Sequence, residues 1–231
     1  MLTLQNRSQV LSSEVTESVR KAYVDLRVDT CLVHERRHNV IRFINHVDSS
    51  DLKASLCRFF SDTRVYVERG GQLHHYEVGG LIDHLLETAR YSLYMYNTMS
   101  KLKKFINKDI LVYCALLHDI GKLSIDEFKD ESPYSIYHAY AGKMRVNNDL
   151  ARFSKRLTDN DIEYISDVIY THHVGVEPEE DEPHRASVES FIIHLADQAS
   201  TTDDRMSRCF SGTLNNAKDF EKEMVPLIHI V

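Results

Sequence analysis

The histidines are the residues in this chain that could carry chemistry: there are 13 among 231 residues, and several lie near acidic side chains. Imidazole nitrogens and carboxylate oxygens together suit divalent ions such as Mn, Fe, Co, Ni and Zn. The candidate ligands lie far apart in the chain, so separate helices must bring them together. In chain order they are His84, His118, Asp119, His138, His172, His173 and Asp197.

The candidates divide into two sets that share Asp119, because a carboxylate has two oxygens and can bridge two ions. We expect one ion to be held by His84, His118, Asp119 and Asp197. We expect a second ion to be held by His138, His172 and His173, with Asp119 shared. Two divalent ions about 3.5–4 Å apart favour in-line attack of an activated water on phosphorus.

Several of these residues also have a purely structural interpretation. His84 can be a core histidine with a backbone partner, and the pair His172 and His173 can complement the dipole at a helix C-terminus. Asp197 follows Ile193 by one helical turn. A buried carboxylate needs a partner, so a metal explains Asp197 better than an unpaired core aspartate does. The ordered set is less easily explained by chance than any single member.

The elements that would position these residues are mostly helices, since prolines are few and alternating strand patterns are rare. The segment 110–117 is apolar nearly all round, which predicts a helix buried at the centre, with Gly121 as its C-terminal cap. Residues 64–71 are either a short strand or a loop. Helices are expected at about 13–27, 40–60, 79–99, 108–119, 135–152, 158–173, 185–202 and 215–224.

Composition is ordinary for a globular protein, with 42% hydrophobic and 27% charged residues and a net charge of −7. No apolar run reaches the roughly 18–20 residues of a membrane span, and the first residues contain no signal peptide. The four cysteines form no C-x-x-C motif, which favours a reducing cytoplasm. We therefore expect a cytoplasmic protein without membrane contact, organised as a helical appendage (1–65) and a domain (66–231).

The order His…His-Asp…His…His-His…Asp, with Leu-Leu-His118-Asp119-Ile-Gly-Lys122, resembles the HD-domain metal-dependent phosphohydrolases over about residues 73–205. The resemblance implies an all-α fold, a helical bundle with a mono- or dinuclear metal centre at its core, and hydrolysis of phosphate esters. Within the family, the segments 73–84 and 107–119 are most similar to the bacterial 3′→5′ exoribonucleases and the HD-type conjugative relaxases.

The sequence also departs from these groups. The first 65 residues have a helical pattern where the exoribonucleases carry an OB-fold. Thr171-His-His-Val replaces a Ser-His-His-Gly signature, and no Gly-Tyr-Pro follows as in cyclic-di-GMP esterases of the HD-GYP type. We expect cleavage of phosphodiester bonds in nucleotides or short or single-stranded nucleic acid. The alternatives are a nucleotide mono- or triphosphate phosphatase and a non-catalytic metal-binding module of a DNA-processing complex.

Two residues outside the ligand set are candidates for substrate contact. Lys122 is expected beside the site as a positive group for substrate phosphate, or else is a solvated lysine at a helix end. His75, preceded by His74, either contacts phosphate or orders its loop. Asp119 and Lys122 are the expected catalytic residues. The cofactor is expected to be one or two divalent ions, with Mn or Fe favoured and Ni, Co, Zn or Mg as alternatives.

Two charged clusters have opposite implications for the size of the substrate. Lys101, Lys103, Lys104 and Lys108 either guide a polyanion or form a solvated face. The acidic residues within 177–182 disfavour a long nucleic acid if they lie near the site. The sequence does not indicate the oligomeric state.

Overall fold

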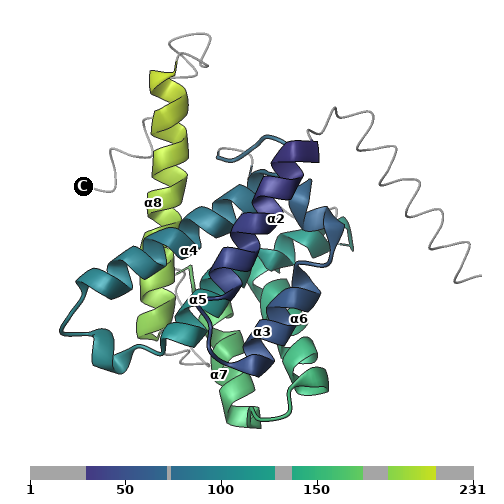
Figure 1. Ribbon diagram of the computed structural model, residues 1–231, viewed down its shortest axis with the longest axis vertical. Coiled ribbons are helices and arrows are strands. Elements are labelled where there is room, and N and C mark those ends of the chain that lie inside the picture. Colours follow the sequence, from purple (N-terminus) through teal and green to yellow (C-terminus); the bar gives the residue numbers. More distant parts are fainter. Residues whose placement is uncertain (1–29, 72–73, 128–136, 174–186, 212–231) are drawn as a thin grey trace, which may run out of the picture.

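The computed structural model describes residues 30–71, 74–127, 137–173 and 187–211. This part of the chain is all-α, as predicted, and forms one bundle around a central helix (Figure 1). Among the described residues, no helix combines the length and apolarity that crossing a membrane requires. In chain order the α-helices are α2 (Thr30–Ile44), α3 (Ser50–Phe59), α4 (Gly80–Thr98), α5 (Lys108–Leu117), α6 (Tyr137–Phe153), α7 (Asp159–Tyr170) and α8 (Val188–Phe210).

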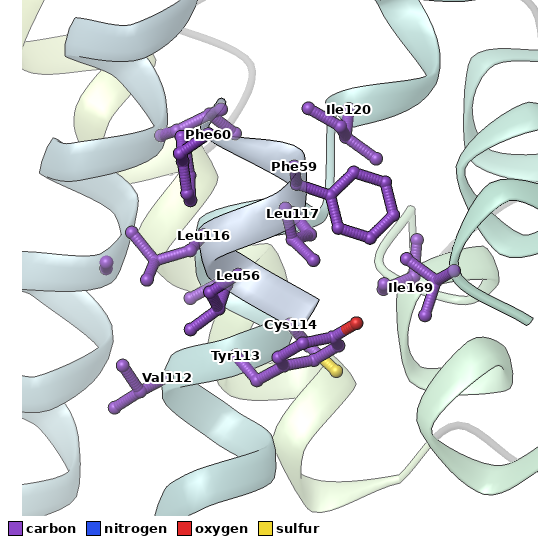
Figure 2. Packing of buried hydrophobic residues seen from close by; sticks show 14 of the residues in the cluster. Leu56, Phe59, Phe60, Val112, Tyr113, Cys114, Leu116, Leu117, Ile120 and Ile169 are labelled. Atoms are coloured by element: carbon purple, nitrogen blue, oxygen red, sulfur yellow. The ribbon is translucent and has the colours of Figure 1, made fainter. Parts of the chain in front are cut away.

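Helix α5 is the centre of the bundle, as its apolar sequence predicted. Every side chain from Leu111 to Leu117 is buried. Helices α4 and α8 pack together against one side of α5, and α7 packs against another, with α6 packed on α7 (Figure 1). Figure 2 shows side chains of α5 beside Phe59 from α3 and Ile169 from α7. Truncating such a buried leucine to alanine typically lowers the free energy of unfolding by about 2–5 kcal/mol. Helix α5 is therefore a stable base for the residues that follow it.

The start of α4 is fixed by a contact from α2. Gly79, the residue before α4, has a φ of 79°, in the left-handed region that glycine adopts without strain. A Cβ atom at Gly79 would lie 2.1 Å from Nη1 of Arg36. The Arg36 guanidinium donates from Nε to Oδ1 of Asp83 at 2.9 Å and also contacts Oδ2. This partly buried ion pair holds the first turn of the helix that carries His84.

The predicted helix over 40–60 is wrong as a single element, because the chain turns between α2 and α3. The turn is stabilised from a distance: the Asp109 carboxylate accepts hydrogen bonds from the backbone amides of Asp48 and Ser49, at 2.7–3.0 Å. Ser49 then caps α3 by accepting from the amide of Leu52. The break therefore depends on a partner some sixty residues further along the chain.

Two smaller predictions are also corrected. Residues 64–71 contain no strand: Thr63–Tyr66 is a 3₁₀ turn whose N-cap, Asp62, accepts from the amide of Arg64. Gly121 is not a left-handed cap, because it lies inside the 3₁₀ segment Ile120–Glu127 that follows α5. A Cβ at Gly121 would lie 1.9 Å from the carbonyl oxygen of His138. Glycine is needed there for the close approach of α6.

The remaining helices lie close to their predicted ranges. Thr158 forms the predicted capping box with Asp161 at the start of α7. Helix α8 begins after the cap Ser187 and continues past the predicted end at 202 to Phe210. The helices expected at 13–27 and 215–224, and the acidic cluster within 177–182, lie outside the described residues.

Helices α2 and α3 contribute to the same hydrophobic core as α5. Val33 and Val40 from α2, and Leu52 and Leu56 from α3, belong to the buried cluster that contains the α5 side chains. The division into an appendage (1–65) and a domain (66–231) stays a prediction. Within the described residues, α2 and α3 form part of the wall that supports α4.

Candidate metal centre

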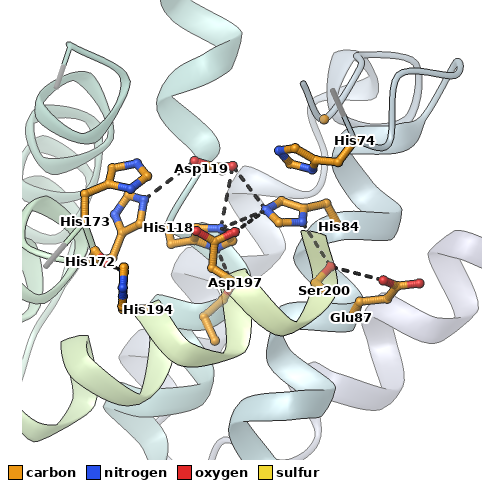
Figure 3. A network of polar contacts seen from close by, with 12 residues as sticks. His74, His84, Glu87, His118, Asp119, His172, His173, His194, Asp197 and Ser200 are labelled. Atoms are coloured by element: carbon orange, nitrogen blue, oxygen red, sulfur yellow. Dashed lines mark hydrogen bonds and ion pairs between the residues drawn. The ribbon is translucent and has the colours of Figure 1, made fainter. Parts of the chain in front are cut away.

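The structure brings the seven candidate ligands together at the end of α5. All of them except His138 are labelled in Figure 3. His118 is the C-cap residue directly after Leu117, and Asp119 follows it. The others arrive from four elements: His84 from α4, His138 from the start of α6, His172 and His173 from the residues after α7, and Asp197 from α8. Six of the seven are buried, and His173 is partly exposed.

A first group consists of His84, His118 and Asp197, whose ligand atoms all lie within 4.8 Å of one another. Nε2 of His84 is 3.2 Å from Nε2 of His118 and 3.1 Å from Oδ1 of Asp197. Oδ2 of Asp119 lies beside this group, 3.3 Å from Nε2 of His84 and 3.6 Å from Nε2 of His118. This is the arrangement expected for the first ion.

A second group consists of Asp119, His138, His172 and His173, again with ligand atoms within 4.8 Å. Oδ1 of Asp119 is 3.1 Å from Nε2 of His138 and 3.8 Å from Nε2 of His172. Nε2 of His173 is 2.8 Å from Nε2 of His138. The two oxygens of Asp119 thus face different groups, which is what a bridging carboxylate requires.

Backbone carbonyls fix the orientation of two imidazoles. The Nδ1 atom of His118 lies 3.0 Å from the carbonyl oxygen of Ala115, and that of His172 lies 2.5 Å from the carbonyl oxygen of Ile169. A carbonyl can only accept, so each Nδ1 carries a proton. In the neutral ring, the Nε2 atom is then a bare lone pair. Both lone pairs point into the cluster.

The surroundings of these lone pairs show whether the cluster can accept a cation. Nε2 of His172 is buried and has no hydrogen-bond partner within the described part of the chain, although it faces Oδ1 of Asp119 at 3.8 Å. Two electron-rich atoms in a dry site repel each other unless a proton or a cation lies between them. A divalent ion satisfies both, and the N/O donor set suits Mn, Fe, Co, Ni or Zn. The residues therefore fit a metal centre.

The protonation states agree with this interpretation. Burial lowers the pKa of His118 and lowers that of His172 strongly, so both rings are neutral ligands at pH 7. Burial alone would lower the pKa of His84 too. Its hydrogen bonds with Asp119 and Asp197 instead raise the pKa of His84 to about 9. In the metal-free protein at pH 7, the His84 ring is therefore protonated, and its positive charge lies between the two carboxylates where a cation would otherwise bind.

Lys122 lies beside the bridging carboxylate, one turn after it in the 3₁₀ segment. Its Nζ is 2.5 Å from Oδ2 of Asp119 and also donates to the carbonyl oxygen of Gly70. Burial favours the protonated form of Asp119, but Lys122, His118 and His138 together hold the pKa of this carboxyl well below its usual range. Lys122 is thus placed at the centre and is not a solvated helix-end lysine.

His74 and His75 occupy different positions. His75 has a φ of 47°, donates from its backbone amide to Asp204 at 2.9 Å, and has its ring Nε2 3.2 Å from Oε2 of Glu87. Its side chain is buried against the loop, which supports the ordering role. Both rings lie close to that of His84, with 4.8 Å between the ring centroids for His74 (Figure 3) and 5.1 Å for His75. Burial lowers the pKa of His74 to about 2, so its ring is neutral.

Sequence reasoning missed two residues behind the cluster, Ser200 and Glu87. Ser200 lies three residues after Asp197 on α8, and Glu87 lies three residues after His84 on α4. That spacing places each on the same helix face as the ligand it follows, which is the signal that could have identified them.

The lysine cluster does not belong to the centre. It follows α4, and the end of that helix lies about 20 Å from His84 at 1.5 Å per residue. Lys103 stacks on Tyr96, and Lys104 stacks on Phe105, with Nζ-to-centroid distances of 4.6 and 4.8 Å. These contacts favour the solvated-face interpretation of the cluster.

A helical bundle with a His-Asp pair at its core and further histidines and an aspartate around that pair is the arrangement of HD-domain proteins. The HD domain family matches residues 81–202, which is more than half of the chain. The chain therefore belongs to the HD domain family, as its motifs suggested.

The dihydroneopterin 2′,3′-cyclic phosphate phosphodiesterase of Methanocaldococcus jannaschii is 28% identical to this chain over 144 residues. The match covers 61% of this chain and 55% of the archaeal enzyme, so the chain spans about half the length of this curated relative. No solved structure matches the chain.

Proposed function

We propose that the protein is a metal-dependent phosphohydrolase that cleaves phosphodiester bonds in nucleotides or in short, single-stranded nucleic acid. One observation carries this proposal: seven buried or partly buried ligand-type side chains from five elements converge, with bare imidazole lone pairs facing the two oxygens of one carboxylate. A cluster built only for stability would pair donors with acceptors. At His172 the imidazole lone pair instead faces Oδ1 of Asp119 at 3.8 Å, acceptor against acceptor, which leaves room for a cation.

In this proposal, His84, His118, Asp197 and one oxygen of Asp119 hold one ion. His138, His172, His173 and the other oxygen of Asp119 hold a second. When bound, divalent ions lower the pKa of water and neutralise charge on phosphoryl oxygens. Mn or Fe is favoured by the mixed histidine and carboxylate donors.

The chain's own residues supply orientation and charge. Asp119 stays ionised because the Lys122 ammonium beside it lowers the pKa of its carboxyl, so it keeps both oxygens available as ligands. With Asp119 holding a cation, the Lys122 ammonium beside it would be placed to donate a hydrogen bond to a phosphoryl oxygen of the substrate. His74, neutral and next to His84, presents a ring to the same space and can accept a hydrogen bond from a substrate hydroxyl.

The archaeal relative supports the diester rather than the monoester as substrate, since its name describes hydrolysis of a cyclic phosphodiester. Because the match covers only part of both chains, the substrate and the activity of this protein are proposals. Cytoplasmic location likewise stays a prediction.

A panel of substrates tests the proposal. Purified protein is loaded with Mn²⁺ and incubated with bis-p-nitrophenyl phosphate, p-nitrophenyl phosphate, nucleoside 2′,3′-cyclic monophosphates, nucleoside mono- and triphosphates, and short single-stranded oligonucleotides. We expect turnover of the diesters, none of the monoesters, and loss of turnover in Asp119→Ala. The oligonucleotides and the cyclic nucleotides separate a nuclease from a small-molecule phosphodiesterase.

Two results would replace this proposal. Release of phosphate from nucleotides without diester cleavage would make the protein a nucleotide phosphatase. Bound metal with no turnover of any substrate would instead favour a non-catalytic metal-binding module of a DNA-processing complex.

A further inference from the structure

Ser200 links the first group to a carboxylate behind it. Ser200 is fully buried on α8, and its Oγ lies 3.1 Å from Nδ1 of His84. The same Oγ donates to Oε2 of Glu87 at 3.1 Å (Figure 3). A serine hydroxyl has one proton. Because that proton goes to Glu87, Oγ must accept from His84, and Nδ1 of His84 carries a proton.

This link determines which nitrogen of His84 is available as a ligand. With a proton fixed on Nδ1, the neutral ring has its lone pair on Nε2, the atom 3.1 Å from Asp197 and 3.2 Å from His118. The other tautomer would present an N–H to the cation site and leave Nδ1 facing the serine. The hydroxyl therefore selects both the tautomer and the rotation of the ring.

Glu87 is a charged acceptor at the end of this link. Burial raises its pKa, but hydrogen bonds from His75 and Ser200 lower it further than burial raises it. Its Oε2 lies 3.2 Å from Nε2 of His75, so one oxygen receives both hydrogen bonds. The ring of His75 in turn has its Nδ1 3.2 Å from Nδ1 of His74. One carboxylate thus contacts both Ser200, which leads to the ligand His84, and His75, which leads to His74.

We propose that Ser200 and Glu87 are positioning residues that hold His84 in the tautomer and orientation needed to bind a divalent ion through Nε2. The inference rests on the proposed metal centre and concerns the affinity of its first group. Partners of this kind behind a ligand histidine typically change metal affinity by about 10–100-fold. Neither residue touches the ion or the substrate.

Ser92 provides a matched control. It is a fully buried serine on α4, eight residues after His84, and its Oγ has no hydrogen-bond partner within the described residues. Ser92→Ala and Ser200→Ala thus remove the same atom from equally buried positions. Only Ser200 contacts a ligand histidine.

The test is Mn²⁺ binding to the full chain, measured by calorimetry and by electron paramagnetic resonance of free Mn²⁺. We expect Ser200→Ala to weaken the tightest Mn²⁺ site about 10–100-fold. Ser200→Thr, which keeps the hydroxyl, should restore most of the affinity, and Glu87→Gln should cause a smaller loss. Ser92→Ala should bind as the wild type does. Circular dichroism of the metal-free variants shows that each is folded.

The outcomes separate this inference from the proposed function. Wild-type protein that binds Mn²⁺ tightly, with Ser200→Ala and Glu87→Gln within about twofold of it, overturns the positioning role and leaves the metal centre standing. An equal loss in Ser92→Ala also overturns it, because general packing then explains the effect. Wild-type protein that binds no divalent ion overturns the proposed function and this inference together. If Ser200→Ala does not fold, Glu87→Gln, whose side chain is 31% exposed, decides the question.

Discussion

In the first group, both imidazoles are oriented by a hydrogen bond from Nδ1, the nitrogen that faces away from the other ligands. His118 donates to a backbone carbonyl, and His84 donates to Ser200. In the second group, His172 is held in the same way, but Nδ1 of His138 has no hydrogen-bond partner within the described residues. His173 is partly exposed as well. The imidazoles of the first group are therefore preorganised by hydrogen bonds from Nδ1, whereas the Nδ1 of His138 in the second group is not held in this way. A preorganised site loses less freedom on binding, so we expect its ion to bind more tightly.

The largest effect is expected from Asp119→Ala, because this carboxylate is shared by the two groups. Both ions should bind more weakly, and diester turnover should fall to about one thousandth of wild type or less, since several kcal/mol of charge stabilisation are removed. Metal content measured by mass spectrometry, together with turnover of bis-p-nitrophenyl phosphate, checks this. Undiminished turnover in a metal-free Asp119→Ala protein would contradict the shared role.

Substituting one histidine from each group tests the asymmetry directly. His118→Ala should abolish the tighter binding event, whereas His138→Ala should leave it and remove only the weaker one. Calorimetric titration with Mn²⁺ distinguishes the two outcomes by stoichiometry and affinity. If both variants lose the same binding event, the two groups are not independent sites.

Lys122→Gln should lower turnover by about 100–1,000-fold, the range in which one positioned donor to a developing charge acts. Metal affinity should not fall, because the substitution removes a positive charge 2.5 Å from a ligand oxygen. Comparing kcat with the Mn²⁺ dissociation constant separates the two effects. Weaker metal binding in this variant would show that Lys122 supports the centre rather than the substrate.

The smallest effect is a proton released on metal binding. The pKa of His84 is raised to about 9 from an ordinary value near 6.5. The charged ring therefore stabilises the metal-free protein fully below pH 6.5, and that contribution is lost as pH rises through 9. Binding through Nε2 displaces the proton, so apparent affinity should rise between pH 6.5 and 9.

His118 contributes no such proton at neutral pH, because burial lowers its pKa. Calorimetry at pH 7.5 in two buffers of different ionisation enthalpy measures the release. Identical binding enthalpies in both buffers would contradict a charged His84.

Much of the fold could be predicted from local signals. The apolar run of α5 and the capping box of Thr158 are contained within a few residues, so both were found. The turn between α2 and α3 depends on Asp109, and the role of Gly121 depends on the backbone of His138. Such long-range partners leave no local pattern, which is why these two features were predicted wrongly.

In the candidate site, too, residues with a local sequence signal could be predicted and residues defined by distant contacts could not. The ordered histidines and aspartates were visible because ligand types are rare and their order is distinctive. Ser200 and Glu87 were missed because serine and glutamate are common on helices, and only the fold reveals that they meet His84 from behind. The roles assigned to all of these residues are proposals.

Anomalous diffraction from crystals of the protein soaked with Mn²⁺ tests the central claim most directly. We predict two peaks joined by the Asp119 carboxylate, one among His84, His118 and Asp197 and the other among the second group, with higher occupancy in the first. Crystals that contain Mn²⁺ elsewhere but show no density among these side chains would contradict the account.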